Sequence, residues 1–131
     1  MRYLLDTCSL LWLAGDRARL PGAAQAAINV VASPLHVSVV TLAEIHRLCR
    51  KGVITLNSPE GPRRWFEQVC LHHQVAIEPI TLAVADAAEA LPWLHKDPAD
   101  RWIVATAQSL DATILTPDRL ISQYPGVNVL W

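Results

Sequence analysis

Four acidic side chains lie where strand-like segments of this 131-residue chain pass into helix-like segments, namely Asp6, Glu44, Asp100 and Asp118. In an open α/β sheet, ligands bind at the carboxyl ends of the strands. Carboxylates gathered at that edge form an oxygen-rich pocket for a hard divalent cation such as Mg²⁺ or Mn²⁺. Two such ions can activate a water and stabilise the leaving oxygen of a phosphodiester. The chemistry that we expect is therefore metal-dependent hydrolysis of a phosphodiester bond.

Each of these acids also has an ordinary structural role open to it. Glu44 would complete a capping box with Thr41. Asp100 and Asp118 would stabilise the starts of helices. Asp6 has no obvious helix to cap. If all four share one edge about 5 Å apart, each neighbouring pair repels by roughly 3 kcal/mol at an effective dielectric of about 20. Protonation or a bound cation must offset that repulsion.

Alternating strand and helix patterns must position these acids. Apolar runs predict strands at residues 2–6, 35–40, 75–80, 112–115 and 127–130. Helices are predicted at residues 8–14, 23–31, 41–51, 63–73, 83–91 and 97–109, with a short one from residue 116. Asp97 would be the N-cap of the 97–109 helix, with Pro98 at its first position. This alternation predicts one domain over residues 1–131, a three-layer α/β/α sandwich with a mainly parallel central sheet.

The composition limits the class of protein further. Hydrophobic residues make up 52% of the chain and charged residues 18%, which leaves apolar surface for a partner, including Leu10, Leu11, Trp12 and Leu48. No apolar run reaches the roughly 20 residues of a membrane span, and no signal peptide is evident, so we expect a cytoplasmic protein without a membrane segment. The three cysteines are odd in number and form no CxxC pair, which predicts buried free thiols.

Charge is distributed unevenly although the net charge is only −1. Residues 1–65 hold eight Arg or Lys and four Asp or Glu, hence +4, whereas residues 66–131 hold three and eight, hence −5. The basic excess comes from Arg17, Arg19, Arg47, Arg50, Lys51, Arg63 and Arg64. It is either a basic rim that holds a polyanion over metal ions or ordinary solvated surface.

An ordered set of short motifs resembles the PIN-domain ribonucleases, and within them a subgroup of VapC-type toxins. The motifs are residues 4–7, 37–45, 95–107, 115–119 and 124–127. The resemblance spans essentially the whole chain. It implies a PIN-like fold and a Mg²⁺- or Mn²⁺-dependent endoribonuclease that hydrolyses RNA with a metal-activated water. It also implies the toxin of a toxin–antitoxin pair, a homodimer neutralised by a small VapB-like antitoxin. The RNA target, whether tRNA, rRNA or mRNA, stays open.

The resemblance also implies roles for individual residues. Asp6, Glu44, Asp100 and Asp118 fall on the family's catalytic and metal-binding acids. Asp97 falls on an extra acid of the subgroup, either a further ligand or only an N-cap. Thr7, Thr116 and Arg101 fall on positions that line the pocket. Ala99 replaces the usual aromatic residue, a change of packing more than of chemistry. Whether one or two ions bind stays open.

Two other readings of the chain remain. An α/β phosphatase or phosphoacceptor domain would use Asp6, but Cys8 stands where the phosphatase class has a second Asp. A catalytically weak or inactive PIN-like module would bind RNA or protein without cleavage. The presence of all four acids argues against that module.

Overall fold

Five parallel strands form a single sheet in the computed structural model, which describes residues 1–30, 32–94 and 96–131. The strands are β1 (Arg2–Leu5), β2 (Leu35–Ser38), β3 (Val75–Glu78), β4 (Ala112–Leu115) and β5 (Asn128–Leu130). Their order across the sheet is β3-β2-β1-β4-β5, so β1 lies in the centre. Val31 of the predicted 23–31 helix and His95 of the resemblance motif lie outside the described residues.

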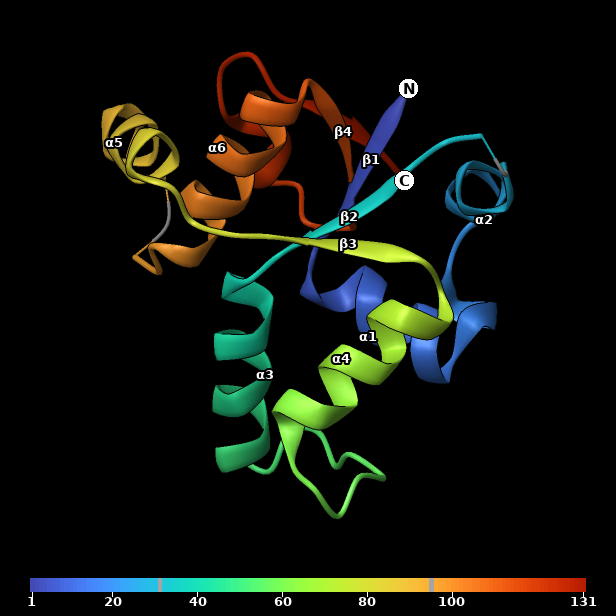
Figure 1. Ribbon diagram of the computed structural model, residues 1–131. Helices are drawn as coiled ribbons and strands as arrows, with labels where there is room; N and C mark the ends of the chain where they lie inside the picture. Colours follow the sequence, from blue (N-terminus) through green and yellow to red (C-terminus); the bar gives the residue numbers. More distant parts are fainter. Residues whose placement is uncertain (31, 95) are drawn as a thin grey trace.

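Helices cover both faces of this sheet (Figure 1). The helices are α1 (Thr7–Gly15), α2 (Gly22–Asn29), α3 (Val40–Arg50), α4 (Pro62–His72), α5 (Leu82–Ala90) and α6 (Ala99–Leu110), with 3₁₀ turns η1 (Arg17–Arg19) and η2 (Ile121–Gln123). Helices α1 to α4 pack with one face of the sheet, and α5 and α6 lie on the other side. The predicted α/β/α sandwich is confirmed, and each recorded strand pair is parallel.

The core is divided by the alternation of side chains along β1. Leu5 packs on the side of α1, α3 and α4, in a cluster with Ile45 and Phe66. Its neighbour Leu4 points to the opposite face and packs with Ile103 and Val104 of α6. Strands buried on both faces need apolar residues at nearly each position. This requirement is why the strands were evident as continuous apolar runs in the sequence.

Three predictions about how helices begin are wrong. Helix α3 begins at Val40 and has no capping box between Thr41 and Glu44. The 116–118 segment is a loop and not a helix. Asp6, for which no capping role was expected, is the N-cap of α1. Glu44 instead accepts a hydrogen bond from the Thr7 hydroxyl of a different helix, a contact that no local pattern predicts.

No helix within residues 1–30, 32–94 and 96–131 is long and apolar enough to cross a membrane. All three cysteines are free. Cys70 is buried and Cys49 is half-buried, but Cys8 is exposed, so the prediction of a buried thiol is wrong at Cys8.

Candidate functional site

The carboxylate of Asp6 is fixed at the centre of the sheet edge. It accepts hydrogen bonds from the backbone N–H of Ser9 at 2.8 Å and from the Ser9 hydroxyl at 2.5 Å. The hydroxyl of Thr116 donates to its other oxygen from a position 110 residues away. Leu5 pairs with Leu115 in the sheet, so the parallel strands β1 and β4 deliver Asp6 and Thr116 to one point. The side chain of Asp6 is therefore pre-positioned by helix α1 and by the end of β4.

Burial makes this carboxylate costly to ionise. Desolvation raises the pKa of Asp6 above its ordinary value, the charge of Asp118 adds to the rise, and the hydrogen bonds from Ser9 and Thr116 oppose it. The Ser9 hydroxyl also lies within hydrogen-bond distance of the carbonyl of Leu115. A hydroxyl can share its proton between two acceptors in a three-centre contact, so Ser9 connects the Asp6 carboxylate to the end of β4.

Glu44 reaches the same edge from α3. The hydroxyl of Thr7 donates to Glu44 Oε1 at 2.7 Å and lies 3.4 Å from the hydroxyl of Thr41. Burial raises the pKa of Glu44, the charges of Asp100 and Asp97 raise it further, and the Thr7 bond and Arg47 lower it. Thr7 thus links α1 to α3 through its contact with Glu44.

Asp97 joins the site through Arg47. Arg47 Nη1 lies 2.6 Å from Asp97 Oδ2, and Nη2 lies 3.5 Å from Glu44 Oε2. Asp97 also accepts a hydrogen bond from the backbone N–H of Ala99 at 2.9 Å, although the N-cap position of α6 is Pro98. Asp97 therefore has both a capping contact and an ion pair to the site.

Asp118 is held in the loop after β4. Its backbone N–H donates to Thr116 Oγ1 at 3.0 Å, and its own Oδ1 accepts from the N–H of Leu120 at 2.9 Å. Asp100 lies in the first turn of α6, where a carboxylate is favourable. Thr116 thus contacts both Asp6 and the Asp118 backbone, which supports its place in the pocket.

Electrostatic coupling links the four acids in two pairs. Asp118 affects the pKa of Asp6, and Asp100 affects that of Glu44. Partial burial of the Cys8 thiol raises its pKa to about 11, and the charges of Asp6, Glu44 and Asp118 raise it further. Because a thiol with so high a pKa is protonated at neutral pH, it is a poor nucleophile.

The donor chemistry of this edge fits a hard divalent cation. The candidate ligands are carboxylates, and a cation would offset the burial and mutual repulsion that raise the pKa values of Asp6 and Glu44. Over the residues that the structure describes, however, no three Asp, Glu, His or Cys side chains converge closely enough to hold an ion as they stand. The acids lie at the same edge of the sheet, but their carboxylate oxygens contact other groups of the protein and not a common centre.

Arg101 is buried rather than open to the pocket. Its side chain is 1% exposed, and its guanidinium lies 3.8 Å from the ring centre of Trp93, which is 69% exposed. A cation under an aromatic face is stabilised by the ring. The resemblance implies a pocket-lining role for Arg101, and in this structure its guanidinium is buried against the ring of Trp93.

Three further residues have roles near the acids that the sequence did not predict. They are Ser9, Arg47 and Tyr124. Ser9 bonds to Asp6 and Arg47 bridges two acids. The hydroxyl of Tyr124 is buried without a hydrogen-bond partner among the described residues, and burial, Asp100 and Asp118 raise its pKa while Arg101 lowers it. Ser9 could have been found from its place three residues after an N-cap Asp, and Arg47 from its i+3 spacing to Glu44. Nothing local marks Tyr124.

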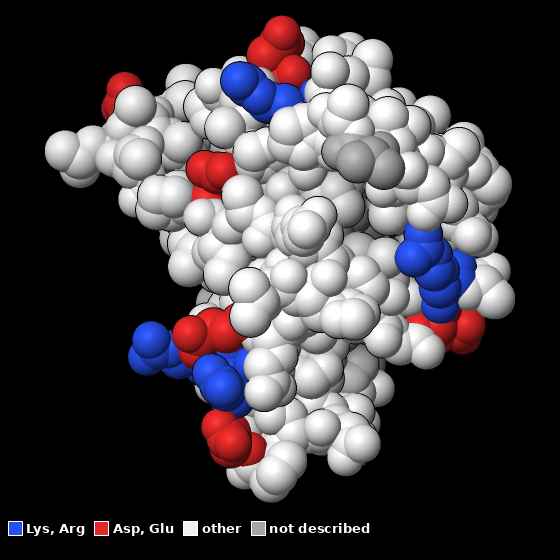
Figure 2. All heavy atoms as spheres, turned by 45° about the vertical axis from the view of Figure 1, so that its right-hand side comes forward, with Lys and Arg blue, Asp and Glu red and all other residues white. Residues whose placement is uncertain are grey.

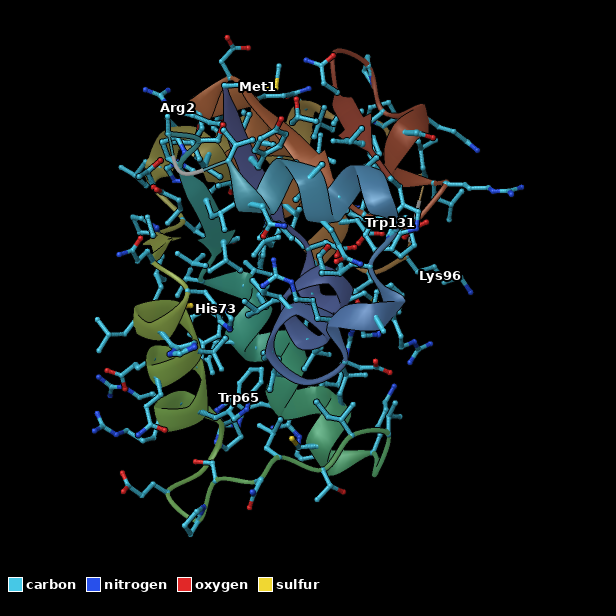
Figure 3. All side chains as sticks on the ribbon, turned by 90° about the vertical axis from the view of Figure 1, so that its right-hand side faces the viewer. Met1, Arg2, Trp65, His73, Lys96 and Trp131 are labelled. Carbon is cyan, nitrogen blue, oxygen red and sulfur yellow. The ribbon has the colours of Figure 1, made fainter. Side chains whose placement is uncertain are left out.

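A second feature is an apolar groove on the other side of α1. Its cavity has a volume of about 430 Å³, and its apolar lining comes from Leu11, Trp12, Ile54, Leu56 and Trp65. Trp65 lies between α4 and α1 (Figure 3). Of the residues expected at a partner surface, Leu11 and Trp12 line this groove, whereas Leu10 is fully buried in the core.

Basic residues form no broad field on the face drawn in Figure 2, where blue and red atoms lie in small mixed groups. Arg63 pairs with Glu67 at 3.3 Å and Arg64 with Glu60 at 3.4 Å. Lys96, next to Asp97, extends away from the molecule (Figure 3). Much of the predicted basic rim is therefore ordinary paired surface, and Arg47 is the rim residue that contacts the acids.

Comparison with known proteins gives four further findings. Residues 3–127 match the model of the PIN domain. The chain is 34% identical to "Ribonuclease VapC22" of Mycobacterium tuberculosis over 98% of this chain and 97% of that protein. Its fold is similar to chains in the crystal structure of VapBC2 from Rickettsia felis bound to a promoter DNA fragment (TM-score 0.73, 15% identity, covering 99% of this chain and 98% of that one). It is also similar to chains of DNA-bound VapBC from Salmonella typhimurium (TM-score 0.70, 17% identity, 99% and 97%).

Proposed function

The chain belongs to the PIN-domain family, and from this premise we propose that it is an endoribonuclease, the toxin of a toxin–antitoxin pair. The observation that carries the proposal is the buried Asp6 carboxylate at the centre of a parallel sheet edge, held by Ser9 and Thr116 and coupled to further acids. The relative from M. tuberculosis is a ribonuclease, and it matches over nearly the full length of both chains.

We assign the chemistry to Asp6, Glu44, Asp100 and Asp118, with Asp97 as a neighbour that orients Arg47. Ser9 and Thr116 hold the Asp6 oxygens in place, and Thr7 does the same for Glu44. Tyr124 and Arg101 are buried beside these acids, and the charges of Asp100 and Asp118 raise the pKa of Tyr124. Residues 1–131 act as one PIN-like domain.

The cofactor that this donor set fits is Mg²⁺ or Mn²⁺. Asp6, Glu44, Asp100 and Asp118 would hold it. When bound, it supplies Lewis-acid chemistry, lowering the pKa of water and balancing charge on the scissile phosphate. In its absence the same acids destabilise one another, because burial and like charge raise the pKa values of Asp6 and Glu44.

RNA is the substrate that we propose, within the cytoplasm, where the three free cysteines would stay reduced. The acids lie at an open sheet edge, so a single-stranded segment of tRNA, rRNA or mRNA can reach them more readily than a regular duplex.

A small antitoxin is the protein partner that we propose. Both solved structures named above are VapBC assemblies bound to DNA. In this chain the groove between α1 and α4 offers Leu11, Trp12 and Trp65 to an apolar helix face. We further propose that two copies of the chain form a homodimer, which sedimentation of the purified protein tests directly.

Asp6→Asn is the substitution that tests the proposed activity. Asn is as good an N-cap as Asp and keeps an oxygen for Ser9, so the fold is retained while the charge is lost. We expect cleavage of a single-stranded RNA to fall by at least ~100-fold, which corresponds to about 2.7 kcal/mol of transition-state stabilisation. Cleavage is measured with Mn²⁺ or Mg²⁺ present and again in EDTA, where the wild-type rate should also collapse.

Asp86→Asn is the matched control, because Asp86 is an exposed acid on α5. It should cleave RNA at the wild-type rate. Undiminished cleavage by Asp6→Asn, or equal activity in EDTA, would show that the chemistry lies elsewhere. RNA binding without cleavage by the wild-type protein would favour the inactive PIN-like module instead.

A further inference from the structure

Arg47 contacts the proposed metal ligand Glu44 and its acidic neighbour Asp97 at once. Its guanidinium lies 2.6 Å from an oxygen of Asp97 and 3.5 Å from an oxygen of Glu44. These acids come from different elements, Glu44 from α3 and Asp97 from the segment before α6. Ion pairing with Asp97 is the largest influence on Arg47 and raises its pKa. Arg47 therefore connects the two halves of the acidic edge.

A guanidinium and a divalent cation compete for the same carboxylate oxygens. Each carboxylate has few lone pairs that can face inward, and one engaged with a planar guanidinium is turned away from a common centre. This competition affects Glu44 and Asp97, which are among the described acidic side chains that do not converge on one point. Glu44 and Asp97 are oriented toward Arg47.

The contacts of Arg47 are suited to exchange. Its side chain is 42% exposed, and its pair with Glu44 has the i,i+3 spacing with a long N–O distance of 3.5 Å. Exposed ion pairs of this kind contribute little to stability, so breaking them costs little. A guanidinium also matches the geometry of a phosphate as well as that of a carboxylate.

We propose that Arg47 is an exchangeable counter-ion of the active site. A divalent cation displaces it from Glu44 and Asp97, and the released guanidinium then pairs with a phosphate of the incoming RNA. This role rests on the proposed ribonuclease function. It makes Arg47 a positioning residue that couples metal loading to substrate binding, since phosphate on the guanidinium leaves the two carboxylates open for the cation.

Arg47→Ala should move two constants in opposite directions. Mn²⁺ alone, titrated by isothermal calorimetry, should bind about two- to fivefold more tightly, because the competing cation is gone. KM for cleavage of a single-stranded RNA should rise by about fivefold with little change in kcat, because a phosphate contact is lost. A purely structural role would weaken both metal and RNA binding. Arg47→Gln repeats the test with the long side chain kept.

Arg50→Ala is the matched comparison, because it removes the same charge from an exposed position one turn further along α3. Its affinity for Mn²⁺ should stay at the wild-type value. If both Arg47 variants bind Mn²⁺ as weakly as wild type or more weakly, the cation does not displace Arg47 and the proposed exchange is wrong. If KM is unchanged, Arg47 does not contact a phosphate of the RNA. Because the Mn²⁺ titration needs no cleavage, it decides the exchange even if the protein proves not to cut RNA.

Discussion

At the scale of single residues, Asp6 combines two duties that usually belong to different side chains. It caps α1 through the N–H of Ser9, and it carries the buried charge on which the proposed chemistry depends. The capping bond and the contact with Thr116 hold the carboxylate where ionisation is unfavourable. The fold thus stores a destabilising charge at its centre, as proteins do at functional sites.

The stability of the metal-free protein should depend on pH through Asp6 and Glu44. Burial raises both pKa values above those of the unfolded chain. The stabilisation from their protonated forms is therefore complete below the unfolded pKa values and is lost as the pH rises through the folded ones. Relative to wild type, Asp6→Asn should gain stability as the pH rises from the unfolded pKa of an Asp, about 4, through the raised folded pKa of Asp6, as measured by urea unfolding in EDTA.

Millimolar Mn²⁺ should reverse this difference at neutral pH, because a ligand that binds the native state stabilises it by mass action. Wild type should then gain more than Asp6→Asn. If the difference in unfolding free energy between the two proteins does not change with pH in EDTA, the assignment of buried, mutually repelling carboxylates is contradicted.

At the scale of elements, the start of α3 decides where Glu44 and Arg47 lie. The fully buried hydroxyl of Ser38, at the end of β2, accepts a hydrogen bond from the N–H of Val40 at 3.1 Å. This contact joins the strand to the first turn of the helix. It stands in place of the capping box that Thr41 and Glu44 would have formed, and it leaves both of those side chains free to face α1.

Ser38→Ala should destabilise the protein by about 1 kcal/mol in urea unfolding, because a buried N–H loses its acceptor. Ser122→Ala provides the comparison, since the exposed Ser122 hydroxyl only donates to a neighbouring carbonyl. Its effect should stay within about 0.5 kcal/mol. Equal effects of the two substitutions would mean that the Ser38 contact does not support α3.

The sequence predicted the fold better than the contacts within the site. Buried parallel strands such as β4 require apolar runs, and its predicted bounds of 112–115 match the structure. The expected positions of the acids were inferred from the predicted strands, because the carboxyl ends of parallel strands meet at one edge of the sheet. The bond from Thr116 to Asp6 joins residues 110 positions apart, and the pair of Arg47 with Asp97 joins separate elements. No local pattern encodes such contacts, since side-chain direction depends on packing.

At the scale of the whole molecule, the acidic edge and the apolar groove are separate surfaces joined by α1. The helix begins at Asp6, and its later residues Leu11 and Trp12 line the groove. A helix is a rigid connection between its two ends. A partner seated in the groove therefore contacts the same element whose N-cap carries the proposed catalytic acid.

Leu11→Glu should weaken binding of the proposed antitoxin by at least about tenfold, because it places an unpaired charge in an apolar interface. Binding is measured by calorimetry with the small protein encoded beside this chain. Leu82→Glu, on α5 and 92% exposed in the free protein, is the matched control and should bind normally. Loss of binding in the control alone would place the partner on the opposite face.

The contact between Thr116 and Asp6 has a consequence during synthesis of the protein on the ribosome. Strand β1 leaves the ribosome first but occupies the middle of the sheet, and its partner β4 follows more than a hundred residues later. Until β4 emerges, the carboxylate of Asp6 lacks Thr116, and the edge that gathers the acids does not exist. Pairings this distant in sequence form late. On the proposed function, a nascent chain that lacks β4 has no assembled site with which to cleave RNA, and a neutralising partner can bind during that interval.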